Sequence, residues 1–139
     1  MDEQLAPRPT RTGVWSLDGR RGTVAEARDR TRGFLVDGRT TPPPLADGTV
    51  EDALLLVSEL VSNAVRHAPG PCTLELADDG HQVTIAVSDT STTVPLPRAP
   101  DLAAGGGFGW YLLHRLAVSI EIALRAQRGK TVSAVLPPS

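Results

Sequence analysis

The stretch that decides the fold reads TVEDALLLVSELVSNAVRHAPG, from Thr49 to Gly70. Thr49 and Asp52 stand at the spacing of a helix N-terminus, and Pro69 with Gly70 supplies a stop. Between these signals the apolar residues recur with the period of a helix, namely Val50, Ala53, Leu54, Val57, Leu60, Val61, Ala64 and Val65. The stretch therefore predicts an amphipathic helix with one buried face.

A polar line runs along the same helix. Glu59 and Asn63 are four residues apart, so both project from one side, and Ser62 and Arg66 flank them. An amide oxygen is a hard ligand suited to Mg²⁺, and a carboxylate can polarise a water or hydroxyl beside such an ion. A solvated face of a surface helix is the simpler interpretation, and the pair alone favours it.

On the N-terminal side of this helix, the sequence predicts a tail, a strand and a second helix. Residues 1–12 are polar and predict a flexible tail, and the alternation over 13–17 predicts a short edge strand. Thr23 and Glu26 have capping-box spacing, and apolar residues then keep helical period as far as position 38. These elements and the remainder of the chain, 13–139, are expected to form a single domain.

On the C-terminal side, strands predominate. Leu74 and Leu76 alternate in one run and Val83, Ile85 and Val87 in the next, which predicts a hairpin around Asp78-Asp79-Gly80. The chain then predicts a long loop over about 90–106, a helix over 108–117, and a hairpin pairing 118–126 with 131–136. The expected fold is a two-layer α/β sandwich, with a mixed, mostly antiparallel sheet and helices on one face.

Composition limits the classes of function. A chain of 139 residues is about one domain long, and a net charge of −2 provides no general attraction to nucleic acid or to an anionic membrane. The single cysteine, Cys72, fits a reducing compartment and is interpreted as a small strand residue. No run approaches the roughly 20 apolar residues of a membrane span, so we expect a soluble, cytoplasmic protein.

Two further motifs could bind a nucleotide. Asp89 follows the strand that contains Val87, and a carboxylate there could accept a hydrogen bond from the exocyclic amine of adenine; an ordinary turn aspartate is the alternative. The glycine-rich run from Gly105 to Gly109 leads into a helix, where backbone N–H groups can bind phosphate; a linker without a ligand is the alternative.

Taken in order, these pieces resemble the GHKL ATPase superfamily, with its Bergerat-type ATP-binding fold, and within it the short bacterial anti-sigma factors that act as serine/threonine protein kinases. The resemblance extends from Trp15 to Leu136. The segment from Glu59 to His67 resembles the N box, Asp89 the aspartate of the first glycine box, and 107–109 the second box. Gly129-Lys130-Thr131 resembles the final box.

The resemblance implies a role for each matching residue. Asn63 would ligate Mg²⁺ and Glu59 would be the catalytic general base. The implied nucleotide-binding residues are Asn63, Arg66, His67, Asp89, Ser91, Gly107, Phe108, Gly109, Trp110 and Thr131. The implied cofactors are ATP and Mg²⁺.

The expected function is an ATP-dependent kinase that regulates transcription by phosphorylating a STAS-type anti-anti-sigma protein, with that protein or a sigma factor as partner. A homodimer is compatible with the resemblance, whereas direct binding to nucleic acid or membrane is not expected. Ser91 and Thr93 stand where the family often has glycine, which keeps a non-catalytic binding module open as an alternative. A stand-alone histidine-kinase catalytic domain ranks last, because about 50 residues without a histidine precede Glu59.

Overall fold

The computed structural model of the chain describes residues 10–37, 47–68, 70–90, 114–124 and 129–136. Within these ranges the main elements are five strands and three helical segments, and residues 114–116 are also helical. In chain order they are β1 (Arg11–Leu17), α1 (Thr23–Arg32), the π-helix η1 (Gly33–Asp37), α2 (Asp47–His67), β2 (Cys72–Asp78), β3 (Val83–Asp89), β4 (Ser119–Leu124) and β5 (Lys130–Val135).

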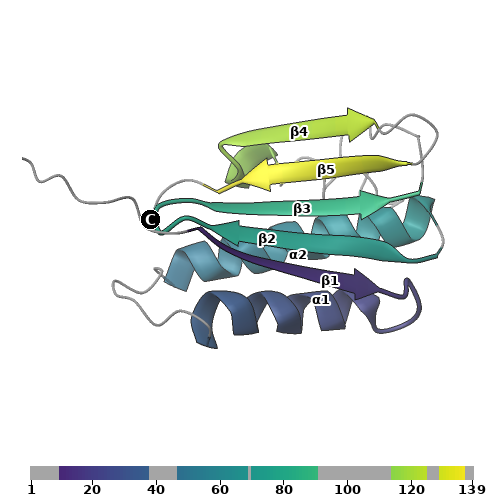
Figure 1. Cartoon of the computed structure of the whole chain (residues 1–139), viewed down its shortest axis with the longest axis horizontal. Coiled ribbons are helices and arrows are strands. Elements are labelled where there is room, and N and C mark those ends of the chain that lie inside the picture. The colour runs from purple at the N-terminus through teal and green to yellow at the C-terminus, as the bar shows by residue number, and fades with distance from the viewer. Residues whose placement is uncertain (1–9, 38–46, 69, 91–113, 125–128, 137–139) are drawn as a thin grey trace, which may run out of the picture.

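The strands form one sheet in the order β1-β2-β3-β5-β4, with α1 and α2 on one of its faces (Figure 1). The expected two-layer sandwich and both predicted hairpins are confirmed. The four strand pairings are all antiparallel, so over the described residues the sheet is not mixed. The sequence did not predict that β5 inserts between β3 and β4, which brings the end of β3 beside the start of β5.

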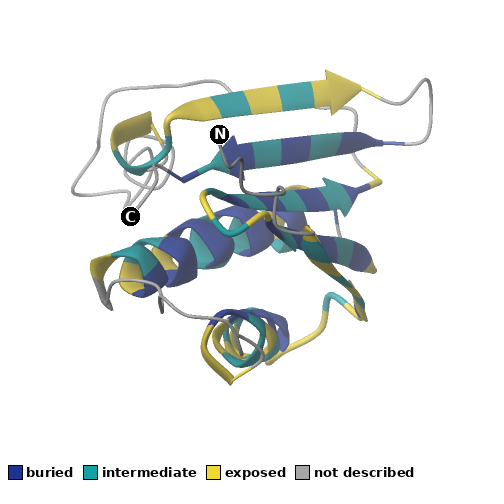
Figure 2. Cartoon of the chain, turned by 60° about the vertical axis from the view of Figure 1, so that its left-hand side comes forward, coloured by how far each residue is buried: buried dark blue, intermediate teal, exposed yellow. Residues whose placement is uncertain are grey.

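The core lies between the sheet and α2. Buried and partly exposed residues alternate along β3 (Figure 2). Ile85, near the middle of this strand, is fully buried. From the helix, Leu56, Val57 and Val61 pack into the same cluster at 0% exposure. The predicted buried face of α2 is therefore confirmed, and this face fixes the rotation of the helix about its axis.

The start of α1 differs from the predicted capping box. The N-cap is Gly22, at φ 92°, and no side chain caps the helix. The Thr23 hydroxyl instead donates to the Arg20 carbonyl at 2.6 Å and contacts Asp18 at 3.1 Å. The expected box was wrong because the preceding tight turn places a left-handed residue at the cap, a conformation that glycine adopts without strain.

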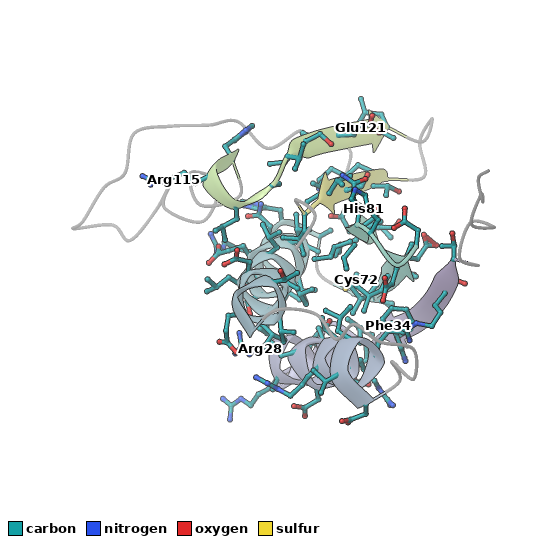
Figure 3. All side chains as sticks on the ribbon, turned by 90° about the vertical axis from the view of Figure 1, so that its left-hand side faces the viewer. Arg28, Phe34, Cys72, His81, Arg115 and Glu121 are labelled. Atoms are coloured by element: carbon teal, nitrogen blue, oxygen red, sulfur yellow. The ribbon has the colours of Figure 1, made fainter. Side chains whose placement is uncertain are left out.

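The two main helices are joined by a polar contact. Arg28 of α1 donates to the Ser58 hydroxyl of α2 at 2.7 Å and lies between the two helices (Figure 3). The helical winding then continues past α1 as η1, so the chain remains helical to Asp37, close to the predicted end. α1 therefore packs on one flank of α2 and does not cover the opposite flank.

The edge strand β1 is tied to the helical layer by aromatic side chains. It begins at Arg11, before the predicted start at residue 13. The Arg11 guanidinium lies 4.4 Å from the centre of the Phe34 ring, and Trp15 meets the same ring edge to face at 5.9 Å.

Among the described helices, none is long and apolar enough to cross a membrane.

Candidate functional site

The sheet end at which β3 stops carries a buried pair of opposite charges. Asp89 is the last residue of β3, and Lys130, the first of β5, lies directly opposite in the antiparallel register. The Lys130 Nζ donates to the two carboxylate oxygens of Asp89 at 2.9 and 3.1 Å. The side chains of Lys130 and Asp89 are 5% and 3% exposed, respectively. Asp89 is therefore not an ordinary turn aspartate, which would lie in solvent.

A glycine allows the two strands to approach this closely. Gly129 has φ +114°, and a Cβ atom at this position would lie 1.9 Å from the backbone carbonyl oxygen of Asp89. A side chain would therefore meet both a strained backbone conformation and a direct clash. Gly129, which the sequence placed in the final motif, has a structural reason to be glycine, since it brings Lys130 within reach of Asp89.

Cys72 lies near the same end of the sheet. It is buried at the start of β2, and its burial, together with the nearby carboxylates of Asp89 and Asp18, raises the pKa of the thiol. The thiol is therefore protonated at neutral pH and is a poor nucleophile. The interpretation of Cys72 as a small strand residue is confirmed.

Glu59 and Asn63 lie on the flank of α2 that faces away from α1. Ser58, which receives the hydrogen bond from Arg28, marks the α1 side. Successive residues turn by about 100° around a helix, so Glu59 and Asn63 lie roughly 100° and 140° from Ser58. Both are half-buried, between the core face and solvent. Arg66 and His67 are exposed in the last turn of α2.

Thr131 is turned away from Asp89. It is one residue beyond Lys130, and successive strand residues point to opposite faces of a sheet. Its hydroxyl is 2.8 Å from that of Ser88, on the face not covered by the helices. The residue that faces Asp89 from β5 is therefore Lys130, which the resemblance had not placed among the site residues. Alternation along β5, considered together with the buried position of Val132, could have indicated it.

Comparison with known proteins assigns the fold to a family. A family model described as the histidine kinase-like ATPase domain matches residues 19–136. The chain belongs to this family. The predicted resemblance to the GHKL superfamily is thus confirmed, and this ATPase domain accounts for most of the chain. No curated protein matches the chain.

Two solved structures match the chain. The crystal structure of the RsbU and RsbW domains of Rv1364c from Mycobacterium tuberculosis matches with a TM-score of 0.63 and 20% identity, over 94% of this chain and 33% of that one. A histidine kinase domain from Erythrobacter litoralis EL346 blue-light activated histidine kinase matches with a TM-score of 0.49 and 20% identity, over 84% and 60%. The matched part is 33% of the mycobacterial chain, and at 20% identity this similarity shows the fold alone.

The donors on α2 suit a magnesium ion in type. An amide oxygen at Asn63 and a carboxylate at Glu59 are hard ligands, and Mg²⁺ keeps most of its waters and takes few protein ligands. Within the described ranges, no three His, Cys, Asp or Glu side chains gather where they could hold a metal ion. The described part of the ATPase domain therefore contains no metal site made only of such side chains.

The remaining predicted site residues lie outside the described ranges. These are Ser91, Gly107, Phe108, Gly109 and Trp110, together with the rest of the predicted loop from 91 to 106. Their roles stay predictions. The described part of the candidate site therefore consists of the Asp89 end of the sheet and the Glu59–Asn63 flank of α2.

Proposed function

We propose that this chain binds ATP with Mg²⁺ and acts as a serine/threonine protein kinase of the anti-sigma-factor type, phosphorylating a STAS-type partner. The observation that carries the proposal is the burial of Asp89, whose side chain is 3% exposed at the end of a central strand. Taking a carboxylate and its ammonium partner out of water costs desolvation energy, which makes such a pair a weak source of stability. A ligand-binding role accounts for its position.

Asp89 would select the base of the nucleotide. An ionised carboxylate only accepts hydrogen bonds, and adenine presents an exocyclic amine that donates one. Guanine and hypoxanthine present a carbonyl oxygen at the corresponding position, which offers no donor. The proposed site therefore prefers ATP to GTP and to inosine triphosphate.

Asn63 and Glu59 would serve the phosphate end of the nucleotide. Asn63 would hold Mg²⁺, which when bound neutralises phosphate charge. Glu59 would accept the proton of a serine or threonine hydroxyl on the partner. The hydroxyl oxygen then forms a bond to the γ-phosphorus while the bond to the β–γ bridging oxygen breaks, which leaves ADP and a phosphorylated partner.

Binding is tested by calorimetry of the full chain with ATP and Mg²⁺. We expect Asn63→Ala to weaken binding by at least about tenfold, which is about 1.4 kcal/mol. Glu51→Ala is the control, because Glu51 lies on the same helix with its side chain 66% exposed, and we expect it to bind as the wild type does. Absence of ATP binding by the folded wild type at millimolar concentration would overturn the proposal.

Phosphotransfer is tested separately, with labelled ATP and the STAS-type proteins of the same genome. We expect Glu59→Gln to lower the rate by about 10²-fold or more, because it removes the proton acceptor while keeping the shape of the side chain. Glu51→Gln makes the same chemical change at an exposed position and should leave the rate unchanged. Equal labelling by the wild type and Glu59→Gln would count against a catalytic base at this position.

A non-catalytic binding module is the second candidate. Ser91 and Thr93 stand where the family often has glycine, and a side chain restricts backbone that glycine would leave flexible. In this case nucleotide occupancy would only set the shape of a protein-binding surface. The two assays separate the candidates, since a module would bind ATP and leave every STAS-type protein unlabelled.

A further inference from the structure

The pairing of Lys130 with Asp89 is unusual for a lysine. Lysine side chains normally extend their charged end into water while the aliphatic stem covers apolar surface. Here the ammonium is turned into the protein, its side chain is 5% exposed, and it contacts both oxygens of one carboxylate. The contact joins residues 41 positions apart in the sequence, so it depends on the register of β3 with β5.

The geometry points to Lys130 as a positioning residue that keeps Asp89 a negatively charged hydrogen-bond acceptor, so that the site selects a base bearing an exocyclic amine. This inference rests on the proposed function. It adds to that function a residue outside the predicted site and gives that residue a measurable task, the discrimination between adenine and a base with a carbonyl group.

The chemistry of a buried carboxylate supports this role. An ionised carboxylate is costly to bury unless an opposite charge and hydrogen bonds compensate it. A neutral carboxyl group carries an O–H donor, which can pair with the carbonyl of hypoxanthine. The ammonium of Lys130, at 2.9 and 3.1 Å from the two carboxylate oxygens, supplies the compensating charge. A carboxylate offers about four acceptor sites, and in the proposed function the amine of the base donates to one of them.

The surrounding backbone makes the pairing a fixed feature. Gly129 allows β5 to start in contact with the carbonyl of Asp89, and Lys130, the first residue of β5, lies opposite Asp89. Thr131, the next residue, points to the opposite face and contacts Ser88. No other residue of β5 has both the position at this sheet end and a charge opposite to that of Asp89.

The test compares the affinities of the full chain for inosine triphosphate and ATP, both with Mg²⁺, by calorimetry. For the wild type we expect ATP to bind at least about tenfold more tightly. In Lys130→Met, which keeps the aliphatic stem and loses the charge, we expect this ratio to fall by about tenfold, towards unity. Ser133→Ala, on the same strand but on the open face, is the control and should keep the wild-type ratio.

Two more variants keep the test decisive if Lys130→Met does not fold. Lys130→Gln retains an N–H donor without charge and should lose the discrimination, whereas Lys130→Arg retains the charge and should keep it. Wild-type discrimination in Lys130→Met or Lys130→Gln would overturn the inference while leaving ATP binding intact. Absence of ATP binding by the wild type would overturn the proposed function and this inference together.

Discussion

Asp89 and Asp78 are both buried aspartates that pair with a cation, at opposite ends of the sheet. Asp78 is 2% exposed, and its carboxylate lies 2.8 Å from Arg11 and also accepts the backbone N–H of Gly80. The contacts of Asp78 thus close the β2–β3 turn and tie down the edge strand. Asp89 ends a central strand, beside the chain that leads into the predicted loop. The two residues therefore form a natural comparison between a structural and a ligand-binding acid.

The buried thiol of Cys72 gives a prediction about pH. Its pKa in the folded protein lies above the ordinary value of 9.0, chiefly because burial disfavours the charged thiolate. The fold therefore favours the protonated thiol, and this contribution is complete below about pH 9 and is lost as the pH rises further. We expect the urea midpoint of the wild type to fall more steeply above about pH 9 than that of Cys72→Ala. Parallel profiles for the two proteins would contradict the assignment.

How far single residues could be predicted depended on how local their partners are. Asp89 was a candidate because of its place after an alternating strand, and Glu59 and Asn63 because of their helical spacing, both of which are local patterns. Their assignment to a nucleotide site came from the resemblance and stays a prediction. Lys130 was missed because its partner lies 41 positions away, across strands whose pairing no local pattern specifies. The motif match pointed to Thr131, which is one residue away from Lys130. In a strand, neighbouring residues point to opposite faces of the sheet, so a shift of one residue moves the prediction to the wrong face.

At the scale of elements, the junction between β3 and β5 depends on one glycine. Gly129 combines a positive φ with a contact that leaves no room for a side chain. Gly22 also has a positive φ, 92°, but a Cβ atom added there would meet nothing within 4 Å. Gly33 has a helical φ of −59° and equally open surroundings. A side chain would therefore meet strain and a clash at Gly129, strain alone at Gly22, and neither at Gly33.

Replacing each of the three glycines by alanine should give a graded loss of stability, measured by urea denaturation. Gly33→Ala should be neutral or stabilise by up to about 1 kcal/mol. Gly22→Ala should destabilise by about 1–2 kcal/mol, the cost of a left-handed residue. Gly129→Ala should destabilise by of the order of 3 kcal/mol or more, because clash adds to strain. If Gly129→Ala loses no more stability than Gly22→Ala, the close approach to Asp89 does not contribute to the free energy of unfolding.

The elements were predictable where one periodicity dominates. α2 has a continuous apolar stripe, and its predicted start at Thr49 is two residues inside the observed start at Asp47. The start of α1 was less predictable, because Thr23 and Glu26 fit a capping box while the hydroxyl of Thr23 bonds within the preceding turn. Local sequence does not distinguish these two uses of one side chain.

At the scale of the whole molecule, the two layers followed from the pattern and the strand order did not. Alternation predicts which face of each strand is buried, and a helix of strong amphipathicity must cover one face of a sheet. The insertion of β5 between β3 and β4 joins segments distant in sequence, so its register is set by packing in three dimensions. This insertion is what places Lys130 opposite Asp89 and Thr131 opposite Ser88.

The measurement that tests the central claim most directly is the affinity for ATP and Mg²⁺ of Asp89→Asn and Asp78→Asn, side by side, at a temperature where both are folded. Asp89→Asn removes one partner of a buried ion pair, which costs about 3–5 kcal/mol of stability. Asp78→Asn should cost less, because its partner Arg11 is 33% exposed. The proposed site predicts that only Asp89→Asn weakens ATP binding, by at least about tenfold, and that Asp78→Asn binds as the wild type does. Equal affinities in the two folded variants would contradict a role for Asp89 in binding the nucleotide.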